Sequence, residues 1–573
     1  MPSSSTHALE TLCITGGPRS GKTSALVGRA LAWGGQDAVF PRTQPAFLFF
    51  CATPWSVDTV QSAVANASED GVVCTPFDYA LRILEDPRVR ALTGRTPHVL
   101  SPAEEAVFYE DLKTSGLKRR RLRELWAFLM CGWANLDDDD PAWICTTEET
   151  AQLELARQIL ALDDAMLAGE VVNLAVHALR ELPDVRREFS SPVVLADDYP
   201  LMSRASQELI DLLACDKLAV AGNPEPTPVA FEPYPCAQGL DLFCQHHPSA
   251  ERVALDEPLH QRKRDHLSAP DLGQEMGLVV STVVEALNAG TAPERIAVVG
   301  VNRTWRANLL RALRSCNIPA EELRLKRQRP LGREMSEPDE AERVRVLKRL
   351  ADNAGDSVAW RQWLSFGDAL GRSAAVAELR RVAEPAGLTL AEALPLLASG
   401  KLEGLPMTSP FAQSLLKPYR QALETLKVVE LSREDAPAAA PAVGGGQDEM
   451  AANAGETPET PGTVVVAKPE DLFGHTFDLV IFGGFVNGFI PSRDLCDVGK
   501  VVGGARERAL AADHAALRLV EGRTSERLVF TSFESCPLEA AEQLGLHIAR
   551  IALKDGQRIC TIEPSSYLEE MGL

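Results

Sequence analysis

A glycine-rich loop close to the start of the chain constrains the fold more than any other feature. The stretch ITGGPRSGKTSAL contains the spacing G-x-x-x-x-G-K-[ST], which falls on Gly16, Gly21, Lys22 and Thr23. An apolar, strand-like segment at Thr11–Thr15 precedes the loop, and a run with helical periodicity follows it. Because strand, glycine-rich turn and helix N-terminus gather unpaired backbone N–H groups around one point, this order of elements predicts an anion-binding loop.

The residue types in the loop predict how ATP and Mg²⁺ would be held. Lys22 would reach the β- and γ-phosphates, and Thr23 would place its hydroxyl on Mg²⁺. A chance match in a glycine-rich turn is the alternative, which the flanking strand and helix disfavour. The expected nucleotide-binding residues are Gly16, Gly17, Pro18, Arg19, Ser20, Gly21, Lys22 and Thr23.

A second apolar strand ends in two adjacent carboxylates. In SPVVLADDYP, the apolar residues run directly into Asp197 and Asp198. Two carboxylates at the tip of an apolar strand are costly unless a cation or strong partners balance them. A P-loop enzyme needs a carboxylate at such a strand end to hold Mg²⁺ and orient water, so we expect Asp197 to share the metal with Thr23. The structural alternative is a turn in which an aspartate caps a helix.

Short β-rich apolar runs recur between longer helical stretches and fall into two groups, which predicts an α/β protein with two parallel-sheet cores. A charged stretch near Pro248–Leu272 separates the groups. The first group comprises Thr11–Thr15, Ala46–Thr53, Val72–Thr75, Pro192–Asp197 and Lys217–Gly222. The second comprises Ile296–Val301, Phe477–Phe485, Arg527–Phe533 and Arg558–Ile562.

Mainly helical segments interrupt both cores. The expected first core takes residues 1–100 and 183–250, with a helical insertion at 101–182. The expected second core takes residues 251–336 and 464–573, with a helical insertion at 337–433. Residues 434–463 are rich in Ala, Pro, Gly and acidic residues, so we expect a disordered linker there.

Composition limits the partners and the compartment. The 573 residues include 58 Lys and Arg against 80 Asp and Glu, a net charge of −22, so any nucleic-acid contact would use local basic patches. The candidate patches are Lys118–Arg123 beside Trp126, Gln261–Arg264 and Arg324–Arg329, and for each one a solvated helix face is the alternative. The sequence has no secretory signal pattern and no membrane-spanning apolar run, so a cytoplasmic protein without membrane contact is expected.

These segments, in this order, resemble the UvrD/Rep family of superfamily 1 DNA helicases, which includes subunits of RecBCD- and AddAB-type machines. The stretch VVLADDYPLMSRASQELIDLL resembles the family's D-E-x-Q-D strand and the helix after it. The stretch FGHTFDLVIFGGFVNGFIPSRD is similar to the family's K-G-L-E-F-D strand, and LRLVEGRTSERLVFTSF resembles its Y-V-A-x-T-R-A-x-x-x-L strand. Similar segments cover nearly the whole chain.

The resemblance implies two RecA-like motor cores and ATP-driven movement on single-stranded or partly duplex DNA, in repair or recombination. It places Asp198 at the position of the catalytic Glu and Arg523 at that of the arginine finger, which reaches the γ-phosphate. The expected catalytic residues are therefore Lys22, Asp197, Asp198 and Arg523. The central expectation is that Lys22 and Arg523 face each other across one cleft.

Departures from the family pattern cluster at the chemistry. Asp198 is one methylene shorter than Glu, which draws the carboxylate back by roughly an ångström. The polar Q-D pair after it is replaced by Pro200 and Leu201, and the lysine of the K-G-L-E-F-D motif by Phe473. No glutamine lies upstream of the loop to recognise adenine, so base specificity stays open.

Two hypotheses therefore follow from the sequence. The first is an ATP-dependent DNA helicase or translocase with weakened catalysis. The alternative is a non-motor ATP- and DNA-binding scaffold subunit, similar to AddB-type proteins, which would work beside a second helicase or nuclease subunit.

Overall fold

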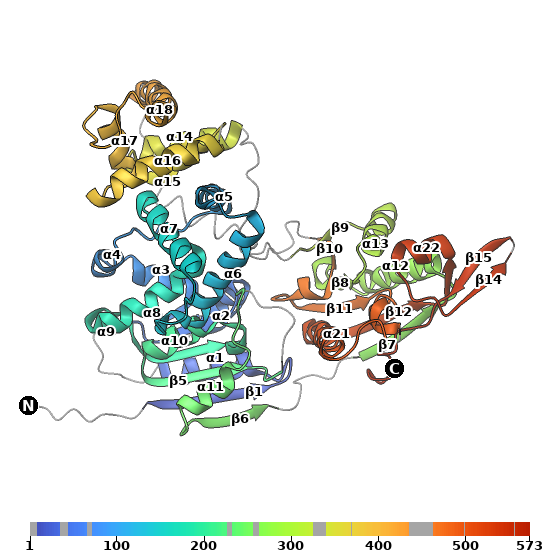
Figure 1. The fold of residues 1–573 in the computed structure, drawn as a ribbon. Coiled ribbons are helices and arrows are strands. Elements are labelled where there is room, and N and C mark those ends of the chain that lie inside the picture. The colour runs from blue at the N-terminus through green and yellow to red at the C-terminus, as the bar shows by residue number, and fades with distance from the viewer. Residues whose placement is uncertain are drawn as a thin grey trace, which may run out of the picture.

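The computed structural model describes residues 9–34, 44–65, 71–225, 232–255, 263–324, 340–367, 369–434, 462–497, 499–554 and 556–573. Two α/β cores lie side by side, and a helical body extends from the first of them (Figure 1). Most of the expected linker, residues 435–461, lies outside the described ranges.

The first core is a six-stranded, entirely parallel sheet with strand order β3-β2-β4-β5-β1-β6. Its side chains alternate between two apolar layers, because successive residues of a strand point to opposite faces. Helices α1 (Lys22–Gly34) and α2 (Pro54–Val64) cover one face, while α3 (Pro76–Leu84), α8 (Val171–Glu181) and α10 (Arg204–Leu213) cover the other. The strands are β1 (Glu10–Gly16), β2 (Leu48–Cys51), β3 (Val72–Cys74), β4 (Ser191–Asp197), β5 (Ala214–Gly222) and β6 (Glu251–Leu255).

The second core is also a six-stranded parallel sheet, with strand order β7-β12-β11-β8-β10-β9. Helices α12 (Leu272–Asn288) and α13 (Arg303–Ser315) pack on one face, and α21 (Gly504–Arg523) packs on the other. The strands are β7 (Lys263–Ala269), β8 (Ile296–Val299), β9 (Ala320–Glu322), β10 (Val464–Ala467), β11 (Phe477–Phe482) and β12 (Thr524–Phe533). Two parallel sheets with helices on both faces confirm the predicted α/β class.

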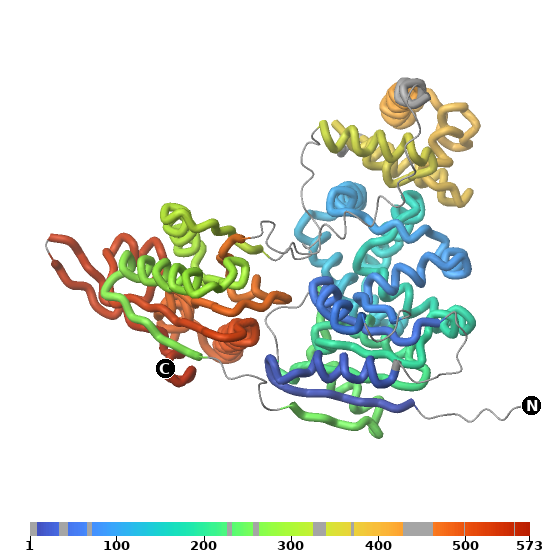
Figure 2. The backbone as a smooth tube through the Cα atoms, turned by 180° about the vertical axis from the view of Figure 1, so that it is seen from behind, coloured from blue at the N-terminus to red at the C-terminus, as the bar shows by residue number. Residues whose placement is uncertain are grey.

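Four details differ from the sequence-based expectation. Helix α8 falls within the expected insertion at 101–182 but packs on the first sheet. Strand β6 joins the first sheet beside β1, beyond the expected boundary at residue 250, and Figure 2 shows the two strands adjacent from behind. Strand β7 joins the second sheet, so the charged stretch is not only a separator. Both are edge strands with several exposed polar residues, which interrupt the apolar pattern. Strand β15 (Gln557–Thr561) belongs to a small antiparallel sheet with β13 (Ser535–Pro537) and β14 (Arg550–Lys554), not to the six-stranded sheet of the second core.

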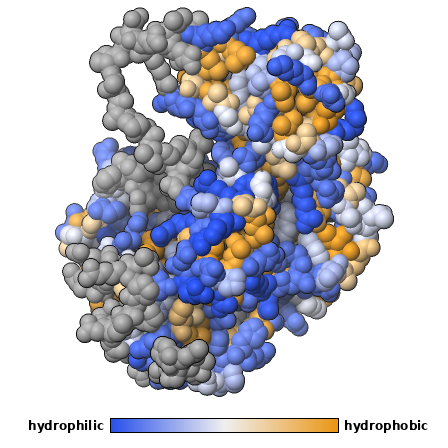
Figure 3. Space-filling view, turned by 90° about the vertical axis from the view of Figure 1, so that its left-hand side faces the viewer, coloured by the Kyte–Doolittle hydropathy of each residue, from blue (hydrophilic) through white to orange (hydrophobic). Residues whose placement is uncertain are grey.

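The two helical insertions pack against each other and form one helical body, seen at the top of Figure 1. The first contributes α5 (Pro102–Leu112), α6 (Arg119–Asn135) and α7 (Thr147–Asp163). The second contributes α14 (Glu340–Asp352), α15 (Ser357–Ser365), α16 (Ala369–Ala383), α17 (Leu390–Ala398) and α18 (Pro410–Glu434). On the face shown in Figure 3, hydrophilic side chains surround separate apolar patches.

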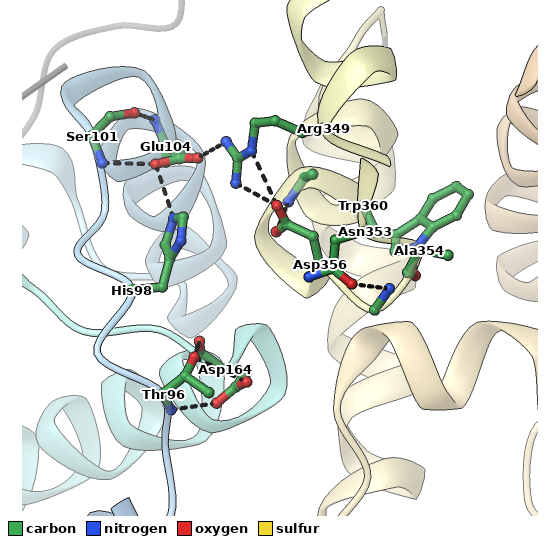
Figure 4. A network of polar contacts seen from close by, with 12 residues as sticks. Thr96, His98, Ser101, Glu104, Asp164, Arg349, Asn353, Ala354, Asp356 and Trp360 are labelled. Carbon is green, nitrogen blue, oxygen red and sulfur yellow. Dashed lines mark hydrogen bonds and ion pairs between the residues drawn. The ribbon is translucent and has the colours of Figure 1, made fainter. Parts of the chain in front are cut away.

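Ion pairs join the two insertions. Arg361 of α15 forms two hydrogen bonds of 2.8 and 2.5 Å with the carboxylate of Asp111 in α5, and both side chains are buried. Arg349 of α14 contacts Glu104 of α5 at 2.5 Å and Asp356 at 2.9 Å (Figure 4). The second insertion is thus fixed to the first by charge pairs as well as by apolar packing.

Candidate functional site

The glycine-rich loop of residues 17–21, named the phosphate loop here, connects the carboxyl end of β1 to the first residue of α1. Lys22 begins this helix, and its Nζ donates to the carbonyl oxygens of Gly16 and Gly17 at 2.9 and 2.6 Å. Burial lowers the pKa of Lys22, while the nearby carboxylates of Asp198 and Asp197 oppose this shift. The ammonium group is therefore held inside the curve of the loop, where an anion would balance its charge.

The side chain of Ser20 is a second indication that the phosphate loop binds an anion. Its Oγ is buried and has no hydrogen-bond partner among the described residues, although buried hydroxyls are nearly always paired. A phosphate oxygen at the loop would supply the acceptor that this hydroxyl lacks. The residues present thus fit a bound phosphate group.

The carboxyl ends of β1 and β4 bring a hydroxyl and a carboxylate together. Thr23 Oγ1 donates to Asp197 Oδ2 at 2.5 Å, and the backbone N–H of Asp198 donates to Asp197 Oδ1 at 3.0 Å. Asp197 is only 5% exposed. Burial first, and then the charge of Asp198, raise the pKa of Asp197 to about 7. A buried carboxylate with this pKa is stabilised as an anion when a cation binds beside it.

This donor set suits Mg²⁺. The ion commonly takes one or two protein ligands together with phosphate oxygens and waters, and Thr23 and Asp197 are a pair of that kind. Within the described ranges there is no cluster of three or more His, Cys, Asp or Glu side chains that could form an all-protein metal cage. The residues therefore match a metal bound with a nucleotide.

Asp198 begins the turn that follows β4. Its backbone is left-handed, with φ of 53°, and Tyr199–Leu201 continue as a short 3₁₀ helix. Aspartate tolerates this conformation better than most residues. Its charge opposes the lowering of the pKa of both Lys22 and Arg523, so the carboxylate lies near both cations.

Arg523 reaches this site from the second core, at the end of α21. A Cβ added to the neighbouring Gly522 would lie 2.8 Å from Pro18 of the phosphate loop, so only glycine permits this approach. Arg19 of the same loop donates to the carbonyl oxygen of Thr524. Burial lowers the pKa of Arg523, Asp198 and Asp197 oppose this, and Arg19 adds to it. One site between the two cores thus contains all the expected catalytic and metal-binding residues, namely Lys22, Thr23, Asp197, Asp198 and Arg523.

No family model matches this chain, and no curated protein matches it in sequence.

The site also contains three aromatic side chains whose contacts sequence analysis did not predict. The guanidinium of Arg523 lies 5.1 Å from the ring centre of Phe473. Trp55, at the start of α2, lies 6.5 Å from Phe473 and 6.4 Å from His475, measured between ring centres. The contacts of Trp55 join residues several hundred positions apart, so no local sequence pattern could have indicated them.

The expected DNA patch beside Trp126 is not formed as predicted. Trp126 is 4% exposed and packs on Phe108 and Trp133 at ring-centre distances of 5.3 and 5.9 Å. The aromatic ring belongs to the core of the first insertion because α6 turns its apolar stripe inward. On the exposed side, Arg120 and Arg121 pair with Glu124 and Glu148.

The other two basic runs are only partly described. Lys263 and Arg264 lie in β7, where Arg264 contacts Glu521 at 2.7 Å, and Arg324 contacts Glu322 at 2.5 Å. The remaining members of these runs, residues 261–262 and 325–329, lie outside the described ranges. None of the described helices is both long and apolar enough to span a membrane.

Proposed function

We propose that this chain is an ATP-binding protein of the DNA helicase or translocase type, with two RecA-like cores that couple ATP hydrolysis to movement on single-stranded DNA. One observation carries the proposal. The phosphate loop of the first core and Arg523 of the second core share a site with two carboxylates. A nucleotide bound there would respond to the relative position of the cores. DNA repair or recombination in the cytoplasm would be its setting.

Each residue of the site would have a separate role in ATP binding and hydrolysis. Lys22 and the loop N–H groups would bind the triphosphate, and Thr23 and Asp197 would hold Mg²⁺. Bound Mg²⁺ would supply positive charge to the phosphate oxygens. Asp198 would orient the attacking water and accept its proton, and Arg523 would stabilise negative charge that develops on the γ-phosphate.

Two features predict slow hydrolysis. Asp198 has a shorter side chain than Glu, so its carboxylate would reach the water less well. Pro200 follows in a buried 3₁₀ turn and offers no side-chain donor or acceptor near the phosphates. The first feature would weaken proton transfer and the second would remove polar contacts to the γ-phosphate, while the phosphate loop could still bind ATP.

A second function is favoured by Phe473. This residue is buried to 3% exposure in the apolar layer of the first core, although it belongs to the second core. Apolar packing between the cores would suit a scaffold subunit that binds ATP and DNA without moving, beside a second helicase or nuclease subunit.

ATP hydrolysis measured with and without single-stranded DNA tests the proposal. We expect DNA to stimulate turnover in the wild type, and Lys22→Ala to abolish both binding and turnover. Equal rates for the wild type and Lys22→Ala would remove the enzymatic function. Tight ATP binding without turnover would select the scaffold function.

A further inference from the structure

Arg523 is held by an aromatic surface as well as by charges. Its guanidinium faces Phe473 at 5.1 Å, within the range in which a cation is attracted to the face of an aromatic ring. Asp198 and Asp197 attract the same guanidinium, while Arg19 and Lys22 repel it. The aromatic ring therefore supports a cation that stands among charges of both signs.

Phe473 is itself fixed by the first core. It belongs to the apolar cluster formed mainly by α3, α8 and α10, together with Leu519 of α21. Trp55 packs edge-to-face against it, with an angle of 81° between the rings. A residue of the second core thus takes its position from the first core.

Gly474 permits the close approach of Trp55. Its φ is 86°, and a Cβ at this position would lie 3.1 to 3.3 Å from atoms of the Trp55 side chain. His475 follows, and burial, together with the charge of Arg523, lowers its pKa to about 4. His475 is therefore neutral near pH 7 and adds no positive charge beside Arg523.

We propose that Phe473 and Trp55 are positioning residues that hold the Arg523 guanidinium toward the phosphate site. Trp55 fixes the ring of Phe473, and that ring supports the guanidinium. A lysine at position 473 would repel Arg523, whereas the aromatic face attracts it. The role in turnover rests on the proposed ATP hydrolysis, but the placement of Arg523 does not.

The test combines kinetics with a mutant cycle. In Phe473→Leu and Trp55→Ala, we expect kcat to fall roughly 10- to 100-fold, because small misplacements of a catalytic group are costly. The dissociation constant of ATP should change less than about twofold, and Trp55→Phe should keep most of the activity. Phe189→Leu is a matched control, since Phe189 packs on Tyr79 in the same cluster, before the amino end of β4.

Arg523→Ala distinguishes positioning from general stability. If Phe473 acts through Arg523, adding Phe473→Leu to Arg523→Ala should lower kcat no further. The inference would be overturned if the decreases in kcat of Phe473→Leu and Arg523→Ala added in the double variant. It would also be overturned if Phe189→Leu lowered kcat as much as Phe473→Leu does.

Hydrogen exchange separates this inference from the proposed function. We expect the amides of residues 520–526 to exchange at least about tenfold faster in Phe473→Leu than in the wild type or Phe189→Leu. If the wild type hydrolyses no ATP, the proposed function fails and exchange alone decides the placement of Arg523. Unchanged exchange in Phe473→Leu would overturn the inference whether or not ATP is hydrolysed.

Discussion

Arg19, in the phosphate loop of the first core, donates a hydrogen bond to the backbone carbonyl of Thr524, the first residue of β12 in the second core. Arg523 immediately precedes this strand, so the contact joins the phosphate loop to the backbone next to the residue expected to reach the γ-phosphate. Arg518 of α21 adds a second link, a 3.1 Å ion pair with Glu225 after β5. The two cores therefore meet at the site where chemistry is proposed.

Two substitutions of Arg19 should show how much backbone strain at this position lowers the stability of the protein, apart from the hydrogen bond to Thr524. Arg19 has a φ of 61°, which costs a non-glycine residue about 1 kcal/mol or more. Arg19→Gly and Arg19→Ala both lose the bond to Thr524, but only glycine relieves the strain. We expect Arg19→Ala to be less stable than Arg19→Gly by about 1 kcal/mol in denaturant unfolding. Equal stabilities would show that the backbone at this position is unstrained.

Mg²⁺-dependent ATP binding should vary with pH through Asp197. Because burial and Asp198 raise the pKa of this carboxyl from 3.8 to about 7, the folded protein holds its proton where the unfolded chain does not. Its contribution to stability is therefore full below about pH 4 and is lost as the pH rises through about 7.

Metal binding requires the ionised form, so affinity for ATP in the presence of Mg²⁺ should increase between about pH 6 and pH 8. Titrations across this range should show the rise in the wild type and not in Asp197→Asn. A pH-independent affinity in the wild type would argue against Asp197 as a metal ligand.

Removing one partner of the buried ion pair that joins the insertions, Arg361 and Asp111, should strongly destabilise the protein. Arg361→Met leaves the Asp111 carboxylate buried without its partner, and we expect a loss of about 3–5 kcal/mol in the unfolding of the helical body. Replacing both, with Arg361→Met and Asp111→Leu, should recover most of that loss. Arg381→Met, which breaks an exposed pair with Glu378, is the control and should change stability by less than about 1 kcal/mol.

Acid should loosen the contact between the insertions at Glu104. Burial alone would raise the pKa of Glu104, but His98 and Arg349 lower it from 4.5 to about 2. The stabilisation is therefore present above about pH 4.5 and is lost as the pH falls toward 2. We expect Glu104→Gln to flatten the acid limb of the stability curve, measured by denaturant unfolding from about pH 2 to 6. An unchanged acid limb would exclude this carboxylate as the sensitive group.

Local patterns predicted the central strands and the phosphate loop. Strand β4 is buried along its whole length, so its sequence is a continuous apolar run that ends at Asp197. The edge strands β6 and β7 escaped prediction because they are mostly exposed or only partly buried, and most of their exposed residues are polar. The candidate patch beside Trp126 did not form as expected because α6 buries this ring and carries its basic residues on the exposed side.

The sequence by itself determined the loop, because Gly16 to Thr23 are adjacent in the chain and the strand and helix that flank them are set by local periodicity. It also placed two carboxylates at the end of an apolar strand. The family resemblance indicated that Arg523 lies near them, but only the tertiary structure decided that Phe473 and Trp55 join it, since these contacts depend on how two separate cores pack. Such packing is governed by surfaces assembled from distant segments, and the order of residues within any one segment does not contain it.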